Sequence, residues 1–455
     1  MAVKTIFVCT NCGAESSKWY GRCPECGEWN TFQELTTEIS KKGKKNSKSN
    51  AVTNTISLFD AFADSETRLK SGIEEFDRVL GGGIVKGSVV LLGGEPGAGK
   101  STLLLQVSTN ICKAGKVLYV SGEESASQIK LRAKRLGLNS KNLLIANETD
   151  VNTVINTIKN LEPELCIIDS IQTIEMDGIQ SSAGSLVQVR ECAAELTRCA
   201  KDTGIPVIII GHVNKDGAIA GPKVMEHIVD TVLYLEGDRY LALRILRSAK
   251  NRYGSTSEIG FFDMTNTGMI GISDPSLLML EGMDADNPGS CLTCIMEGTR
   301  PIVAEIQALT TKSSFSVPRR NSDGLDFNRV NLLLAVIEKR GGYALSSLDV
   351  YLNVTGGLNI NETSSDLAIA VSIISSLLDK PVPAGTVVFG EIGLGGEIRS
   401  ITDLSLRINE IQKLGFSRVV LPKSSISKID PLLKNKMDFI GITNIKEIAK
   451  VFKNE

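Results

Sequence analysis

The sequence has 455 residues, of which 42% are hydrophobic and 22% are charged, a composition that predicts a globular protein of roughly three domains. Lys and Arg number 50 against 52 Asp and Glu, and the net charge of −2 excludes a uniformly basic DNA-coating protein and an acidic solvating tail, though not a local basic groove. With two His residues, no apolar run long enough to span a membrane and no signal peptide, the sequence disfavours His-rich metal sites and predicts a cytoplasmic protein without membrane contact.

The first predicted unit, residues 1–33, carries four cysteines in two Cys-x2-Cys pairs: Cys9, Cys12, Cys23 and Cys26. Each pair is followed by Gly, which suits two tight turns, and four thiolates at this spacing are typical of a structural, tetrahedral Zn²⁺ site. The metal would stabilise a unit too small to bury a core of its own. A rubredoxin-type iron site and unrelated buried cysteines are the alternatives. Between the pairs, four residues either contact nucleic acid or protein or pack within the unit: Lys18, Trp19, Tyr20 and Arg22.

Residues 34–57 form a polar, Lys-rich stretch that predicts a flexible basic linker. Over residues 58–271, strand-like apolar runs then alternate with helical patterns. The strand-like runs are SVVLLGG, KVLYVSG, ELCIIDS and PVIIIGH, and the helical patterns start at Gly99, near SQIKLRAKRLG and near SLVQVRECAAELTRCAKDTG. This alternation predicts an α/β domain with a parallel sheet covered by helices.

A phosphate-binding loop is predicted between the strand VVLL and the helix STLLLQVSTNI, where the sequence fits G-x4-G-K-[ST]. The glycines allow consecutive backbone N–H groups to wrap phosphates at the positive end of the helix. We expect Lys100 to neutralise the β- and γ-phosphates and the Ser101 hydroxyl to ligate Mg²⁺. The sequence therefore predicts a site for ATP and Mg²⁺ made of Gly94, Glu95, Pro96, Gly97, Ala98, Gly99, Lys100, Ser101 and Thr102.

Three further positions are predicted to complete a catalytic site for ATP hydrolysis. Asp169 ends the apolar run LCIID, where a carboxylate polarises the water shell of Mg²⁺; a helix cap beside Ser170 is the alternative. Glu123 and Glu124 follow the strand after the phosphate-loop helix, the place where RecA-like ATPases carry the carboxylate that activates water. The sequence does not choose between the two, and acids in the first turn of a helix are the alternative. His212, at the end of PVIIIG, is either a sensor of the γ-phosphate or a structural His.

Two later segments carry candidate cations. The stretch KNRYG follows the strand LALRIL and is interpreted as a turn that presents Lys250 and Arg252. In oligomeric RecA-like motors such groups reach the ATP of a neighbouring subunit, and solvated surface charge is the alternative. The Gly-rich segment from Lys215 to Lys223 lies between strands, as a DNA-binding loop in a ring would. A loop without function is the alternative there.

Beyond residue 271 the pattern changes, and residues 272–455 predict a separate α+β domain. Cys291 and Cys294 lie in an apolar strand-like run and are interpreted as core thiols on opposite faces or at unequal depth. A cluster of cations is either a DNA-binding face or merely solvated: Lys312, Arg319, Arg320 and Arg329.

The segments CTNCG…CPECG, GGEPGAGKST, LCIIDS, GHVNKDG and KNRYG together resemble the bacterial RadA (Sms) DNA-repair family over essentially the whole chain. The family's motif is KNRFG, and Tyr253 retains the aromatic ring. The resemblance also allows Lys250 and Arg252 to contact DNA, and the sequence does not separate this role from one at the ATP of a neighbouring subunit. The resemblance implies a RecA-like P-loop ATPase core with an N-terminal zinc ribbon and a C-terminal α+β Lon-protease-like domain. It also implies a DNA-dependent ATPase that works as a hexameric ring, a helicase or branch-migration motor on single-stranded or branched DNA, in homologous recombination and repair together with the RecA recombinase.

The Lon-like domain tests a second function, because Lon-type proteases use a Ser–Lys dyad. Ser364 falls at about the place of the nucleophile, but the helix that should supply the Lys has Arg407, which cannot give up its proton to act as a base. Ser364 is interpreted instead as a helix cap, with Asp366 in the first helical turn. A proteolytically inactive scaffold is therefore predicted. An ATP-regulated scaffold or signalling ATPase of the circadian-clock type is the remaining alternative to a DNA motor.

Overall fold

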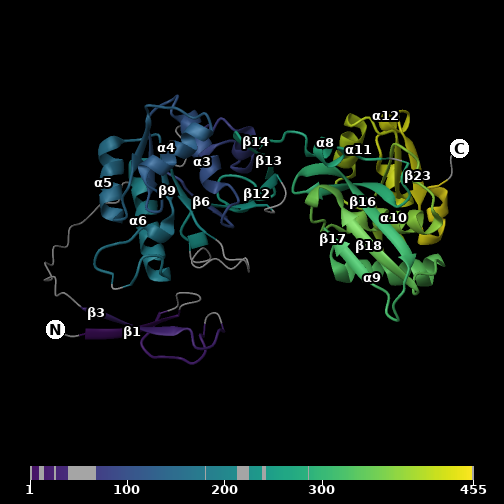
Figure 1. Ribbon diagram of the computed structural model, residues 1–455, viewed down its shortest axis with the longest axis horizontal. Helices are drawn as coiled ribbons and strands as arrows, with labels where there is room; N and C mark the ends of the chain where they lie inside the picture. Colours follow the sequence, from purple (N-terminus) through teal and green to yellow (C-terminus); the bar gives the residue numbers. More distant parts are fainter. Residues whose placement is uncertain are drawn as a thin grey trace. The chain divides into compact units, whose positions relative to one another are not determined.

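The computed structural model describes residues 3–9, 15–24, 27–38, 68–179, 181–212, 225–237, 242–284 and 286–452. The chain separates into two compact units, Met1–Ile272 and Ser273–Glu455 (Figure 1).

The N-terminal cysteine-rich segment contains a small antiparallel sheet of β1 (Val3–Cys9), β2 (Glu15–Ser16) and β3 (Phe32–Glu38), in the order β2-β1-β3. A single antiparallel bridge joins Arg22 and Trp29 in the turn between β2 and β3. The sheet buries the thiol of Cys9 together with Cys23 and Phe32.

The larger part of the first unit is built on a nine-stranded sheet in the order β14-β13-β12-β11-β6-β10-β9-β7-β8. The strands from β8 to β11 along this order run parallel, and β12 to β14 add an antiparallel extension. The strands are β6 (Val89–Gly94), β7 (Val117–Ser121), β8 (Leu143–Ala146), β9 (Leu165–Asp169), β10 (Val207–Ile210), β11 (Thr231–Glu236), β12 (Leu243–Asn251), β13 (Ile259–Thr265) and β14 (Gly268–Gly271). A two-stranded ribbon of β4 (Arg68–Leu69) and β5 (Ile84–Val85) precedes them.

Helices cover both faces of this sheet because its strands are apolar on both sides. Val90 and Leu92 of β6 face one core, with α2 (Glu74–Val79), α3 (Lys100–Ile111) and α4 (Ala126–Arg135). Val89 and Leu91 face the other core, with α5 (Val151–Leu161) and α6 (Leu186–Thr203). Side-chain caps fix where several of these helices begin: Ser125 forms a capping box with Gln128, and Ser185 accepts the N–H of Gln188. The predicted α/β domain with a parallel sheet is confirmed.

The second unit is an α+β domain, as predicted, with a seven-stranded mixed sheet in the order β17-β18-β16-β15-β19-β22-β23. These strands are β15 (Ser290–Glu297), β16 (Arg300–Lys312), β17 (Arg320–Asp323), β18 (Leu348–Val354), β19 (Thr386–Val388), β22 (Arg418–Pro422) and β23 (Asp438–Ile442), and β20 (Glu391–Ile392) pairs with β21 (Ile398–Arg399). The helices are α8 (Pro275–Met279), α9 (Phe327–Val336), α10 (Asp366–Leu378), α11 (Leu404–Lys413) and α12 (Pro431–Lys434).

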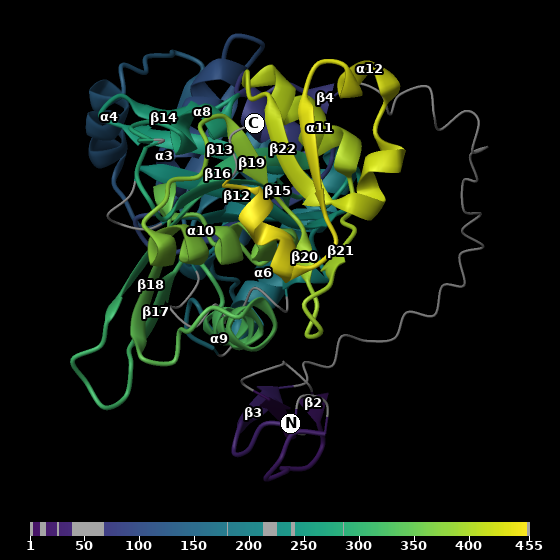
Figure 2. The same cartoon turned by 90° about the vertical axis from the view of Figure 1, so that its right-hand side faces the viewer.

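The apolar helix α10 packs against β15 and β16 of this sheet (Figure 2). Ten of its residues, from Asp366 to Ser375, are buried, which explains why its sequence is apolar all round. Cys291 and Cys294 of β15 are both buried, so the prediction of core thiols is confirmed, and burial raises the pKa of Cys294 to about 12.

Candidate nucleotide and ATPase site

The phosphate loop lies between β6 and α3 and depends on three glycines. Gly94, Gly97 and Gly99 have φ of +151°, +87° and +106°, a region that other residues rarely adopt. A Cβ atom on Gly94 would lie 2.5 Å from the carbonyl oxygen of Leu235, so β6 could not approach β11 with any larger residue there. Next to Gly97, by contrast, a Cβ atom would meet nothing within 4 Å. The loop therefore packs closely against β11 at Gly94, whereas its backbone is accessible at Gly97.

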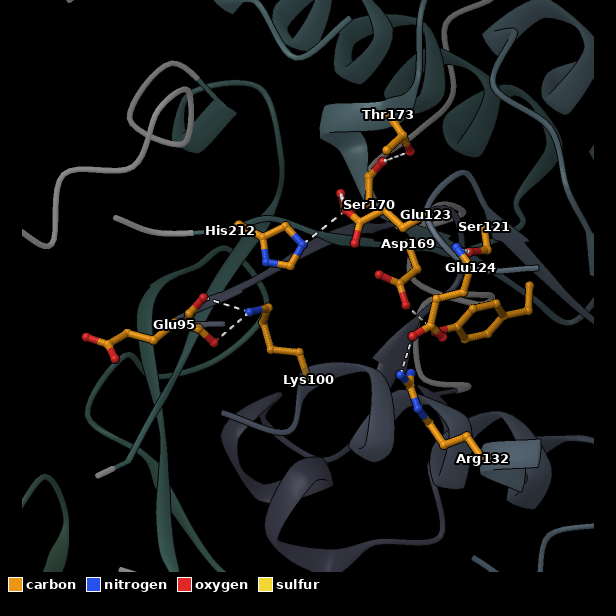
Figure 3. A network of polar contacts seen from close by, with 12 residues as sticks. Glu95, Lys100, Ser121, Glu123, Glu124, Arg132, Asp169, Ser170, Thr173 and His212 are labelled. Atoms are coloured by element: carbon orange, nitrogen blue, oxygen red, sulfur yellow. Dashed lines mark hydrogen bonds and ion pairs between the residues drawn. The ribbon is translucent and has the colours of Figure 1, made fainter. Parts of the chain in front are cut away.

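Lys100 begins α3, and its ammonium group lies against this loop. The Nζ atom donates hydrogen bonds to the carbonyl oxygens of Gly94 and Glu95, at 2.7 and 3.0 Å. Burial lowers the pKa of Lys100, and the negative charges of Asp169 and Glu123 oppose that effect. Lys100 therefore lies in the same group of side chains as Asp169 and Glu123 (Figure 3).

Asp169 ends β9, at the same edge of the sheet as the phosphate loop. Its carboxylate is buried, and its Oδ2 atom accepts the hydroxyl hydrogen of Tyr119 at 2.5 Å. Burial raises the pKa of Tyr119 far above its usual value, and the charge of Asp169 raises it further. Tyr119 therefore remains protonated and acts as a donor that fixes the orientation of the Asp169 carboxylate.

Glu123 points into the same group of side chains from the segment after β7 (Figure 3). Its Oε1 atom accepts hydrogen bonds from the Ser170 hydroxyl and, at 3.2 Å, from Nε2 of His212. The hydrogen bond from His212 is the largest cause that lowers the pKa of Glu123, and the bond from Ser170 acts in the same direction. Glu123 is thus held as a carboxylate at the edge of the sheet where Lys100 and Asp169 also lie.

Glu124 points elsewhere, although it is the next residue. Its carboxylate forms an ion pair with Arg132 of α4, and its backbone N–H donates to the Ser121 hydroxyl at 3.0 Å. The sequence did not distinguish the roles of the two glutamates, but their environments differ. Glu123 contacts His212 and Ser170, whereas Glu124 is paired with Arg132 of helix α4.

Lys250 and Arg252 lie at the opposite edge of the sheet from the phosphate loop. Asn251 pairs with Thr231, and Thr231 pairs with Val90 near the beginning of β6. The Lys250 ammonium donates to the carbonyl of Val229 at 2.8 Å, and Arg252 forms an ion pair of 3.1 Å with a buried aspartate, Asp230.

The length of β6 sets the separation between these cations and the phosphate loop. The backbone N–H of Arg252 bonds to the carbonyl of Asp230, and Asp230 bonds in turn to Val89. Gly94 is five residues further along β6, which corresponds to about 17 Å at ~3.3 Å per residue. Within one chain, Lys250 and Arg252 are therefore distant from the phosphate loop.

The predicted DNA-contact residues are only partly described. Lys215 and Lys223 lie outside the described residues. In the second unit, the Arg320 guanidinium donates to the backbone carbonyls of Leu348 and, at 2.9 Å, of Leu345, so Arg320 supports the beginning of β18. Arg319 is exposed and stacks over the ring of Phe315 at 3.8 Å. The two neighbouring arginines thus have different surroundings.

One cation beside the phosphate loop was missed by sequence reasoning. Arg244 of β12 is buried, and its Nε atom donates to the carbonyl oxygen of Ala98 at 3.2 Å. Nothing in the sequence marks it, since Arg244 and Arg247 both occur in the same apolar strand and only the strand order places one of them under the loop. Tyr119 and Ser170 were missed for the same reason.

The four predicted zinc ligands are half described. Cys9 and Cys23 lie in one buried cluster with Phe32, whereas Cys12 and Cys26 lie outside the described residues. Gly27, after the second pair, has φ of +77° and donates its N–H to the carbonyl of Cys23 at 2.9 Å, which is the tight turn expected there. Among the described residues no group of three or more metal-ligating side chains occurs. The two buried thiols fit a zinc site with four cysteine ligands, of which the remaining two would be Cys12 and Cys26.

In the second unit, Ser364 is not a helix cap, so that prediction was wrong. Helix α10 begins at Asp366 with Ser365 at the N-cap, and no side chain caps it. The buried hydroxyl of Ser364 instead accepts a hydrogen bond of 3.2 Å from the guanidinium of Arg407. Asp366 lies in the first turn as predicted, where it pairs with Arg329.

Arg407 occupies the place where a Ser–Lys dyad would need its base. It is fully buried, forms an ion pair with Glu362 and donates to the carbonyl oxygens of Cys294 and, at 3.2 Å, of Thr402. A guanidinium only donates hydrogen bonds and offers no base, so Arg407 cannot activate the hydroxyl of Ser364.

Family models match three parts of the chain. A model described as "AAA domain" matches residues 56–218, one described as "Rubredoxin metal binding domain" matches residues 7–34, and one described as "Subunit ChlI of Mg-chelatase" matches residues 328–425. The "KaiC-like protein PH0186" from Pyrococcus horikoshii OT3 is a similar solved structure, with 21% identity and a TM-score of 0.39 over 45% of this chain and 99% of that chain. A parallel sheet that gathers a phosphate loop and two carboxylates at one edge is the arrangement of P-loop ATPases with a RecA-like core, and the chain is an ATPase of this class.

Relatives similar over nearly their whole length identify the family. The "DNA repair protein RadA" of Bacillus subtilis (strain 168) is 47% identical over 455 residues, which cover 98% of this chain and 98% of the relative. That of Streptococcus pyogenes serotype M6 is 46% identical over 447 residues, with the same 98% coverage of both chains. The chain belongs to the RadA family of DNA-repair proteins. Within the described residues, no helix combines the length and the apolar character needed to cross a membrane.

Proposed function

We propose that this protein is a DNA-dependent ATPase that works as a ring-shaped motor, a helicase or branch-migration enzyme. It acts in the cytoplasm on single-stranded or branched DNA during homologous recombination and repair, together with the RecA recombinase. The observation that carries the proposal is the separation of two sets of groups on one sheet. Lys100, Asp169 and Glu123 lie at one edge, and Lys250 and Arg252 at the other.

Within one subunit, the residues around the phosphate loop have distinct roles. Backbone N–H groups of the loop and the ammonium of Lys100 bind the β- and γ-phosphates. Ser101 and Asp169 would hold Mg²⁺, and the ion would supply charge neutralisation on the phosphate oxygens. Glu123, held as a carboxylate by His212 and Ser170, accepts the proton of the attacking water.

The position of Glu123 favours it over Glu124 as the base. Burial lowers the pKa of Lys100 and the charge of Glu123 opposes that effect, so the two side chains share one electrostatic environment. Glu124 is instead paired with Arg132. His212 links Glu123 to the end of β10, directly before the segment that contains Lys215 and Lys223. Contact of DNA with that segment would therefore act on Glu123 through His212.

A neighbouring subunit supplies what the single chain lacks. Because Arg252 lies about 17 Å along the sheet from its own phosphate loop, its guanidinium can stabilise a transferring phosphoryl group only at the site of another copy of the chain. Repeated contacts between the two unlike edges build a head-to-tail assembly, which closes as a ring. We propose a homo-hexamer, as the family resemblance implies.

The other parts of the chain serve this assembly. We propose a zinc ribbon over residues 1–33, a basic linker over 34–57, the RecA-like ATPase domain over 58–271 and a Lon-protease-like domain over 272–455. Arg407 beside Ser364 argues against proteolysis by the last of these. That domain would act as an assembly scaffold, and DNA contacts would come from Lys215, Lys223 and the exposed Arg319, with Arg320 supporting the strand next to it.

The test is ATP turnover measured with and without single-stranded DNA, followed by unwinding of a branched DNA substrate and by mass measurement of the assembly with ATP. Stimulation by single-stranded DNA supports the proposal. A turnover rate that DNA leaves unchanged would instead support a scaffold or signalling ATPase, and hydrolysis of casein would support a protease. Binding of labelled RecA to the full-length chain tests that partnership separately.

A further inference from the structure

The two tryptophans of the chain, Trp19 and Trp29, both lie on the surface of the N-terminal ribbon. Their side chains are 52% and 67% exposed, and Tyr20 beside them is 46% exposed. Large aromatic side chains are usually buried, because each removes a large apolar area from water. Three exposed aromatic rings within one small fold therefore mark a candidate binding surface.

The two indole rings converge on one point of the ribbon. A Cβ atom on Gly21 would lie 3.7 Å from the ring of Trp19 and 3.9 Å from the ring of Trp29. The indole N–H of Trp19 donates to the carbonyl of Phe32 at 3.2 Å, and the ring of Tyr20 lies 6.0 Å from that of Phe32. These contacts fix the orientation of the aromatic rings on the surface of the ribbon.

Two cations border the aromatic rings. Arg22 pairs with Trp29 across the strand bridge, and its guanidinium lies 5.9 Å from the centre of that ring. The side chain of Lys18 is exposed. Arg22 also donates to the carbonyl of Gly27 at 2.7 Å, so its position is fixed. We call the surface of Lys18, Trp19, Tyr20, Arg22 and Trp29 the aromatic patch.

We infer that the aromatic patch binds single-stranded DNA, with bases stacked on the indole rings and phosphates next to Lys18 and Arg22. Flat aromatic faces bordered by cations are the combination that binds single strands without sequence preference. The inference deepens the proposed function, because it rests on DNA being the macromolecule on which the ATPase acts.

Tryptophan fluorescence of the full-length chain tests this directly, since the signal comes from Trp19 and Trp29 alone. We expect an oligomer of deoxythymidylate to quench the emission in a saturable way that higher salt weakens. Quenching should occur equally in the Lys100→Ala variant, because the aromatic patch does not require ATP turnover.

The Trp29→Ala variant measures the contribution of stacking, with Trp19 as the remaining reporter. Binding of the oligomer should weaken at least about fivefold, the effect of losing one stacked base, while Trp29→Phe should restore most of it. ATP turnover without DNA should be unchanged in both variants. Equal binding by Trp29→Ala and the unaltered chain would overturn the inference.

The outcomes separate this inference from the proposed function. If DNA stimulates ATP turnover but leaves the tryptophan emission unchanged, the aromatic patch does not bind DNA and the proposed motor function stands. Quenching without stimulation would support the patch and refute the motor. Emission that responds to a protein such as RecA and not to the oligomer would overturn the inference in favour of a protein-docking surface.

Discussion

Replacing Glu123 by Gln tests the proposal that Glu123 is the general base. The substitution keeps the shape of the side chain and still offers an oxygen to His212 and Ser170, but it removes the carboxylate that accepts a proton. A positioned general base contributes about 10²- to 10⁴-fold to the rate, so kcat should fall by that factor. Binding of ATP should change little, because Lys100 and the phosphate loop are untouched.

Glu124→Gln is the matched control. Glu124 and its partner Arg132 have side chains that are 31% and 26% exposed, so their ion pair contributes at most about 1 kcal/mol to stability. Its loss should leave kcat within about twofold, a change far below the effect of removing a base. Both variants are measured by steady-state phosphate release and by binding of a fluorescent ATP analogue. The opposite pattern, with Glu124→Gln inactive and Glu123→Gln active, would refute the assignment.

The pH dependence of turnover gives a second measure of the same contact. Hydrogen bonding lowers the pKa of Glu123, so its carboxylate form persists to lower pH than that of an ordinary Glu, and activity is lost as the pH falls through the lowered pKa. His212→Ala removes the largest cause of the shift. The pKa should then rise, and the acid limb of the kcat profile should move to higher pH. An acid limb that stays in place in His212→Ala would contradict this account.

Three further predictions follow from the same contacts. Lys100→Ala should abolish hydrolysis, measured as phosphate release, because no other described cation donates to the loop carbonyls of Gly94 and Glu95. Arg252→Ala should still bind ATP but lose hydrolysis or its stimulation by DNA by about 10³-fold or more, the approximate value of an arginine that acts on a neighbour's phosphates; normal DNA-stimulated turnover and branch migration would refute this role. Arg407→Ala should lower the stability of the second unit by about 3–5 kcal/mol in urea unfolding, because Glu362 is left without its buried partner.

The phosphate loop was predictable because its chemistry depends on neighbours along the chain. Three glycines, a Lys and a Ser at fixed spacing can be read directly between a strand and a helix. The choice between Glu123 and Glu124 was not predictable, because it depends on the order of β7, β9 and β10 in the sheet. That order brings Ser170 and His212 to Glu123, and α4 brings Arg132 to Glu124.

Tertiary contacts also explain the prediction that failed. Ser364 has the sequence of a helix cap, since an acid follows it and an apolar helix begins shortly afterwards. Its hydroxyl is nevertheless taken by Arg407, which lies 43 positions later in the sequence. The residues next to Ser364 predict a hydrogen bond to the nearby backbone of the helix. They do not show that Arg407, from a distant helix, supplies a stronger, charge-assisted hydrogen bond.

Having two unlike edges on one sheet affects how the activity of an assembly depends on its composition. In the proposed assembly, an open row of subunits would leave the phosphate loop at one end and Arg252 at the other without a counterpart, so only closure would give every subunit a complete site. Lys100→Ala and Arg252→Ala chains, each inactive alone, would carry their defects on opposite sides of a shared contact. Mixing them should restore part of the turnover, because some contacts would join an intact loop to an intact arginine.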